Sequence, residues 1–137
     1  MSRRVAFVKY QLPALVWSVA IFALSAVPGM SSVRFPIRAD KLIHGAIYFI
    51  LCLLVWRALH HQTRFPNLQK RALLAAYFFT LAYGALDEFH QIFVPGRTPD
   101  PMDLLADGTG ALLSVLVLVW WLWKEKRVKG PETFDKS

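Results

Sequence analysis

The sequence lacks the features that a disulfide-rich, repeat or nucleic-acid-binding protein would need. Its single cysteine, Cys52, lies inside an apolar run, so it can form no intramolecular disulfide and is expected to be a small buried side chain. No internal repeat or low-complexity segment is present. The net charge is +7, yet no basic helix face or basic strand studded with aromatic residues occurs, so we expect no nucleic acid among the partners.

What the sequence has in abundance is apolar residues. Of its 137 residues, 55% are hydrophobic, and the mean hydropathy is +0.38. Such values are too apolar for a soluble domain of this size, and four runs are long enough to cross a membrane. The sequence predicts an all-α integral membrane bundle of four transmembrane helices, forming a single domain over residues 1–137 with its core at about 40–122. The expected helices cover about 10–27, 40–59, 72–94 and 102–123.

Helix-terminus signals mark these segments. Asp40 is the expected N-cap of the second helix, and Asp100 followed by Pro101 predicts an N-cap and first helical residue, with Asp103 at the third position. The connector over 60–71 is polar and is expected to be a plain solvent loop. Small residues that allow close helix contact are Gly84, Gly108 and Gly110.

The distribution of basic residues predicts the orientation. Arg3, Arg4 and Lys9 before the first run are similar to a signal peptide, but that run is long enough to span and is expected to be a retained helix. Twelve of the 16 lysine and arginine residues fall on the side of the termini and of the 60–71 connector. This bias predicts a multi-pass protein of the cytoplasmic (inner) membrane, with both termini cytoplasmic, 124–137 as a cytoplasmic tail, and the lipid bilayer as a partner.

Polar residues interrupt the apolar segments at their outer ends. Charge inside hydrocarbon is costly, so these residues are a functional-site hypothesis. In the second segment Asp40, His44 and Tyr48 have i, i+4, i+8 spacing and share one helix face. At ~1.5 Å per residue, Asp87 lies ~10 Å and His44 and Asp107 lie ~6 Å inside their helix ends, which predicts a polar pocket facing the outer side. Its candidate residues are Asp40, Lys41, His44, Asp87, Glu88, His90, Gln91, Arg97, Asp103 and Asp107.

Two readings of this pocket involve a bound ion. Lys41 and Arg97, with His44 and His90, could hold the phosphate or carboxylate of a lipid-linked or anionic envelope ligand, although the many acids oppose an anion. Alternatively, the two histidines with Asp87, Asp103 or Asp107 could bind a zinc- or manganese-type ion that activates water, although their spacing matches no recognised metal motif. Metal and cofactor therefore stay unknown.

A third reading is acid–base catalysis without metal. Asp87 paired with His90 or His44 is then the candidate base. No serine or cysteine lies in a nucleophile motif. Asp87 and Glu88 are about 100° apart on a helix, so at most one is expected to point into the pocket.

A purely structural reading competes with all three. Asp40, Asp100 and Asp103 could be helix caps, and Asp87–Arg97 or Asp107–Lys41 ion pairs could lock the helices together. Caps do not account for Asp87 and Glu88, because these acids lie near a helix C-terminus, where the helix dipole disfavours them.

Several of these residues occur in a familiar order. The pattern Asp40-Lys41-x-x-His44, Asp87-Glu88-x-His90-Gln91, Pro95-Gly96-Arg97, Asp103 and Asp107 resembles the VanZ-like family of small membrane proteins, over roughly 40–122. The named member of that family is associated with resistance to the glycopeptide antibiotic teicoplanin. The resemblance implies a membrane protein that binds or modifies a cell-envelope or lipid-headgroup component. A structural or partner-binding protein and a metal-dependent membrane hydrolase are the alternatives, and whether the protein is an enzyme stays open.

Overall fold

The computed structural model describes residues 2–28 and 37–129. Helices make up 84% of the described residues, and this part of the chain contains no strand, so the all-α prediction is confirmed. Much of the expected loop before Asp40, with Arg34 and Pro36, and the end of the predicted tail lie outside the described residues.

The first apolar segment is a rod of three helical pieces. It consists of α1 (Arg3–Ala6), a π-helical turn (Phe7–Gln11) and α2 (Leu12–Ser25). In the π-turn the N–H of Leu12 donates to the carbonyl of Phe7, directly before Pro13, a residue that lacks an N–H and disturbs the regular helical ladder. The whole helical segment begins at Arg3, before the expected start at Tyr10, and ends at Ser25.

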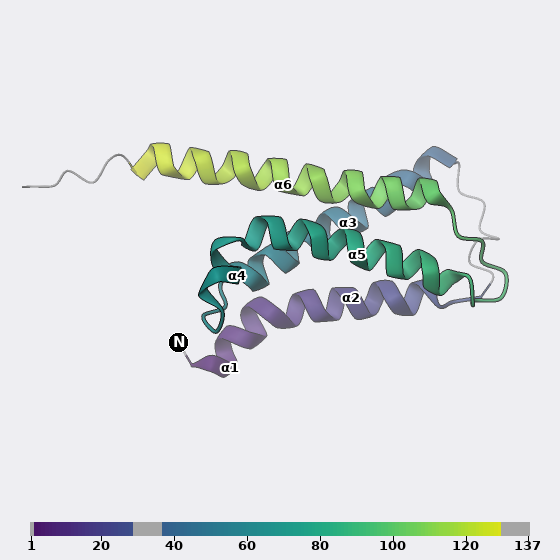
Figure 1. The fold of residues 1–137 in the computed structure, drawn as a ribbon, viewed down its shortest axis with the longest axis horizontal. Helices are drawn as coiled ribbons and strands as arrows, with labels where there is room; N and C mark the ends of the chain where they lie inside the picture. The colour runs from purple at the N-terminus through teal and green to yellow at the C-terminus, as the bar shows by residue number, and fades with distance from the viewer. Residues whose placement is uncertain (1, 29–36, 130–137) are drawn as a thin grey trace, which may run out of the picture.

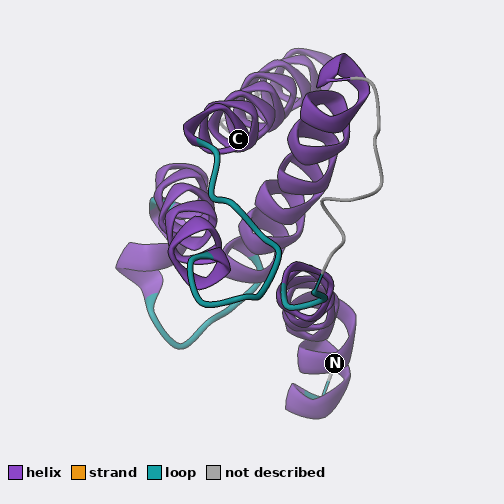
Figure 2. Ribbon diagram, turned by 90° about the vertical axis from the view of Figure 1, so that its right-hand side faces the viewer, coloured by secondary structure: helices purple, strands orange, loops and turns teal. Residues whose placement is uncertain are grey.

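Three long helices complete the bundle: α3 (Ile37–His60), α5 (Ala72–Gln91) and α6 (Pro101–Lys129). Helix α3 packs against α6, α5 and α2, and Figure 2 looks along these helices and shows them bundled together. The 60–71 connector contains a short helix, α4 (Pro66–Lys70), so the prediction of a plain loop was wrong. Four helices are long and apolar enough to cross a membrane, which confirms the predicted bundle. They are Arg4–Ser25, Ala39–His60, Ala72–Gln91 and Pro101–Val128.

A contact between two glycines brings α3 and α6 together. A Cβ atom on Gly110 would lie 2.7 Å from the carbonyl carbon and 2.9 Å from the Cα of Gly45. Only glycine fits so close a backbone approach. The predicted close contact at Gly110 is confirmed, whereas Gly45 was not predicted as its partner.

Many large apolar side chains point outward, and small side chains make up much of the interior. Leu42 is 74% and Phe93 69% exposed, whereas Cys52, Ala76 and Ala111 are fully buried. An outer surface of large hydrophobic side chains suits lipid rather than water. In Figure 1 the start of α1 and the end of α6 lie at one end of the bundle, and the 92–100 connector lies at the other.

Candidate functional site

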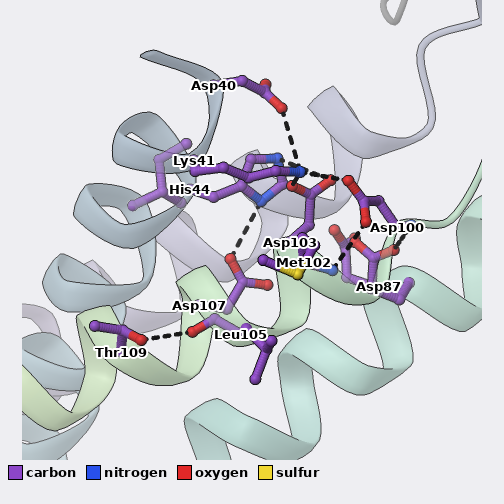
Figure 3. A network of polar contacts seen from close by, with 12 residues as sticks. Asp40, Lys41, His44, Asp87, Asp100, Met102, Asp103, Leu105, Asp107 and Thr109 are labelled. Atoms are coloured by element: carbon purple, nitrogen blue, oxygen red, sulfur yellow. Dashed lines mark hydrogen bonds and ion pairs between the residues drawn. The ribbon is translucent and has the colours of Figure 1, made fainter. Parts of the chain in front are cut away.

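The polar residues gather at the end of the bundle that carries the 92–100 connector, and we call this region the acidic end (Figure 3). Three helices and the connector contribute to it. Its members are Asp40, Lys41 and His44 of α3, Asp87, Glu88 and Gln91 of α5, Asp100 of the connector, and Asp103 and Asp107 of α6.

Asp40 lies in the first turn of α3, because that helix begins at Ile37. Its expected role as N-cap was therefore wrong. The three residues before it, Ile37, Arg38 and Ala39, adopt the helical conformation, so the helix starts one turn earlier. A carboxylate in the first turn still interacts favourably with the helix dipole.

The ammonium group of Lys41 is the centre of the acidic end. Its Nζ donates to Asp100 Oδ2 at 2.5 Å and to Asp103 Oδ1, and it lies 3.7 Å from Asp40 Oδ2. Lysine has three donors and no acceptor, so three carboxylates match its capacity. The expected Asp107–Lys41 ion pair is not among the ion pairs of the described residues. Lys41 pairs instead with acids nearer the helix ends.

Asp100 has two roles. Its Oδ1 accepts a hydrogen bond of 2.9 Å from the N–H of Met102, so the predicted N-cap of α6 is confirmed. The hydrogen bond from Lys41, together with this backbone bond, holds the pKa of the Asp100 carboxyl below its usual value of 3.8. The N–H of Asp100 in turn donates to Glu88 Oε2 at 2.9 Å, so a side chain of α5 fixes the start of α6.

His44 lies between two carboxylates of α6. Its Nδ1 is 3.2 Å from Asp107 Oδ1, and its Nε2 is 3.8 Å from Asp103 Oδ2. Asp107 is only 2% exposed, the least of the acids of the acidic end. Both candidate acids of α6 thus face one histidine and fix the orientation of its imidazole ring.

Tyr48 lies beside Asp107 and was missed as a site residue. It is 1% exposed, and its hydroxyl has no hydrogen-bond partner within the described part of the chain. A Cβ on Gly84 would lie 3.2 Å from both Tyr48 Cε1 and Asp107 Oδ2, which places the ring close to the Asp107 carboxylate. The i, i+4, i+8 spacing with Asp40 and His44 was the signal that could have identified it.

Asp87, Glu88 and Gln91 form the α5 side of the acidic end. Gln91 Nε2 lies 3.4 Å from Asp87 Oδ2 and 3.4 Å from Glu88 Oε1, and all three side chains are buried. The expectation that only one of the two acids turns inward was wrong, because the longer Glu88 side chain reaches the N–H of Asp100. Asp87 Oδ1 has no hydrogen-bond partner among the described residues.

Two predicted site residues do not contact this network. The ring of His90 packs against Phe22 of α2, with centroids 4.6 Å apart, and Arg97 Nη2 donates to the carbonyl of Leu24 at 3.0 Å. Neither the Asp87–Arg97 ion pair nor a polar contact of Asp87 with His90 or His44 occurs among the described residues. The side chains of His90 and Arg97 face α2 instead of the carboxylates.

One group of side chains has the spacing of metal ligands. One ligand atom from each of Asp40, His44 and Asp103 lies within 4.8 Å of the others. Nitrogen and carboxylate oxygen suit a zinc- or manganese-type ion. Lys41, however, binds two of the same three residues, so a metal ion would compete with its ammonium group.

Four membrane-spanning helices with inward-facing charge at one end define a polytopic helical-bundle membrane protein. The family model described as VanZ/LLP1 matches residues 3–123, which is most of the chain, so the protein belongs to the VanZ/LLP1 family. The match also includes α1 and α2, which precede the motif residues. Searches of curated proteins and of solved structures returned no match.

Proposed function

We propose that the protein binds or modifies a cell-envelope or lipid-headgroup component at the outer face of the cytoplasmic membrane, with the acidic end as its binding pocket and both termini in the cytoplasm. One observation carries this proposal: Lys41 and His44 of α3 are bonded to carboxylates of the connector and of α6 within a single network. Buried or half-buried ionisable groups that meet from several helices mark functional sites in membrane proteins.

The charge balance favours a ligand that donates hydrogen bonds. The acidic end holds six carboxyl groups but only one lysine and one histidine. Lys41 is already paired, and His90 and Arg97 face α2. Carboxylates accept hydrogen bonds and repel anions. The ligand is therefore an envelope component that presents amine or hydroxyl groups, such as a phospholipid headgroup or a lipid-linked cell-wall intermediate.

Each residue then has a role. His44, oriented by Asp107, exchanges a proton with the ligand, and Asp87, whose Oδ1 has no partner in the described structure, accepts a hydrogen bond from it. Glu88, Gln91, Asp40 and Asp103 shape the pocket around the ligand. Lys41 binds the nearest carboxylates and holds them in place. His90 and Arg97 fix this end of the bundle against α2 and support the pocket from outside.

The test compares three phospholipids that share a phosphate and differ in donors: phosphatidylethanolamine with an amine, phosphatidylglycerol with hydroxyls, and phosphatidylcholine with neither. Added to detergent-purified protein, phosphatidylethanolamine or phosphatidylglycerol should raise the unfolding temperature, since a ligand at 100 times its Kd stabilises by about 2.7 kcal/mol. Asp107→Asn, which keeps the side-chain volume, should abolish the shift caused by phosphatidylethanolamine. Equal shifts with all three lipids would contradict the proposal and favour a structural ion-pair network.

The link to antibiotic resistance is part of the same proposal. Expression of the wild-type protein in teicoplanin-sensitive cells should raise the inhibitory concentration of teicoplanin, and the Asp107→Asn variant should not. The same increase with both proteins would separate resistance from the acidic end.

The Asp40, His44 and Asp103 group favours a second candidate, a metal-dependent membrane hydrolase. Elemental analysis of the purified protein should then find stoichiometric zinc or manganese that is absent from a His44→Ala variant. Metal content that does not change with this variant would eliminate the candidate.

A further inference from the structure

The opposite end of the bundle carries a groove between α4 and the first two turns of α5. Its volume is about 620 Å³, and its lining includes Lys70, Arg71, Leu74 and Phe78. None of these residues belongs to the acidic end, and the site proposed above makes no use of them. The groove combines a cationic mouth with an apolar wall.

The mouth of the groove is positively charged, and no acid of the described residues forms an ion pair with its cations. Lys70 and Arg71 are both exposed and take part in no ion pair among the described residues. The sequence contains no Asp or Glu from Lys41 to Leu86. Helix α5 starts here with no side-chain cap and no acid in its first turn, so the positive end of its dipole adds to the two cations. Arginine and lysine beside each other suit a phosphate group.

The wall of the groove follows a membrane-spanning helix. Arg71, Leu74 and Phe78 have i, i+3, i+7 spacing, so they lie along one face of α5. Phe78 lies ~10 Å further along the helix than Arg71, at about 1.5 Å per residue. Leu74 is 58% and Phe78 59% exposed, so this face is open along that length. The charge is thus at the helix start and the apolar surface extends towards the middle of the span.

We propose that this groove binds an anionic phospholipid of the surrounding bilayer, with its phosphate on Lys70 and Arg71 and an acyl chain along Leu74 and Phe78. A soluble phosphate would use only the mouth and leave the apolar wall uncovered. A zwitterionic lipid would gain less from two unpaired cations. The order of charge and apolar surface along α5 matches the order of headgroup and chain in a phospholipid.

Native mass spectrometry of the detergent-purified full chain tests this with two probes, phosphatidic acid and phosphatidylcholine. Wild-type protein should retain phosphatidic acid in preference to phosphatidylcholine. The Lys70→Gln, Arg71→Gln double variant should lose roughly 30-fold in affinity for phosphatidic acid, because each basic side chain near an anionic lipid contributes about fivefold. Both residues are exposed, so the variant should fold like the wild type.

The matched control is the Lys124→Gln, Arg127→Gln variant. These cations lie on α6 towards the same end of the bundle and do not line the groove. The control should keep wild-type affinity. An equal loss in the control would show that the attraction is the diffuse charge of this end and would overturn the proposal, as would an unchanged affinity in the Lys70, Arg71 variant.

A third variant, Phe78→Ala, separates the lipid from its headgroup. It keeps both cations and shortens the apolar wall, so it should weaken retention of phosphatidic acid without changing the weak binding of glycerol phosphate. Unchanged retention of phosphatidic acid would contradict the placement of the acyl chain.

Discussion

Charged side chains are arranged in opposite ways at the two ends of the bundle. At the acidic end, side chains turn inward and bind one another across helices, as Lys41 does with Asp103. At the other end, which we call the basic end, exposed cations such as Lys124 and Arg127 lie over aromatic rings of their own helix, Arg127 at 3.8 Å from the Trp123 ring centroid. Outward charges can be exchanged with little effect on packing. Inward charges contribute both to the stability of the helix packing and to the proposed site.

The largest expected effect is on Lys41. Lys41→Met leaves the carboxylates of Asp100 and Asp103 without their cation, and we expect a loss of about 3 kcal/mol in the free energy of unfolding. Lys70→Met, at the basic end, should change it by less than about 0.5 kcal/mol. Unfolding of both variants in mixed detergent micelles measures the difference. Similar losses would remove the distinction between the two ends.

A double variant sharpens this result. Adding Asp103→Asn to Lys41→Met removes the more buried of the two uncompensated carboxylates. It should recover much of the lost stability, because the cost arises from unpaired charge rather than from the missing lysine. No recovery would point to lost packing of the lysine stem.

A smaller effect is expected at the helix crossing that brings the acidic end together. Gly110→Ala forces α3 and α6 apart against the backbone of Gly45, at an expected cost of about 1–3 kcal/mol. Gly108→Ala is the control, because its Cβ would meet only the flexible end of the Leu81 side chain at 3.2 Å. That variant should be close to neutral, since alanine is a better helix former than glycine. Equal costs would exclude the Gly45–Gly110 contact as the determinant.

The smallest expected effect is the pH dependence at Asp100. Its pKa is lowered in the folded protein, so its contribution to stability is present above 3.8 and is lost as the pH falls below that value. Its side chain is 42% exposed, which limits the effect to below about 1 kcal/mol. Asp100→Asn keeps the N-cap acceptor and removes the charge, so its unfolding free energy should fall less between pH 6 and pH 3. If the unfolding free energy of Asp100→Asn fell as much as that of the wild type over this pH range, the role of the Lys41–Asp100 pair would be contradicted.

Periodicity predicted which residues share a face within each helix. The lengths of the apolar runs predicted the four spans, and the polar residues at the outer ends of these runs predicted the gathering of His44, Asp87 and Asp107 at one end. Neither pattern could predict how the helices are rotated against each other, because that depends on the backbone contact between Gly45 and Gly110. The partner of Lys41 followed from this rotation and was predicted wrongly.

The connector after α5 set a second limit. Gly96 adopts a positive φ of 77°, and the chain near it turns Arg97 towards the carbonyl of Leu24 on α2. A turn of this kind leaves no periodic pattern, so Arg97 was assigned to the pocket from its charge and its place in the VanZ-like pattern. Asp100 was predicted as a cap from the proline that follows it. Its ion pair with Lys41 depends on a residue 59 positions earlier in the chain, which no local pattern could indicate.

The inward charges of the acidic end are proposed to form a ligand site. The most direct test is the rise in unfolding temperature caused by phosphatidylethanolamine in three proteins: wild type, Asp107→Asn, and Lys70→Gln with Arg71→Gln. We expect the same rise, relative to each protein without lipid, in the wild type and in the basic-end variant, and no rise in Asp107→Asn. A full rise in Asp107→Asn, or its loss only in the basic-end variant, would contradict the claim.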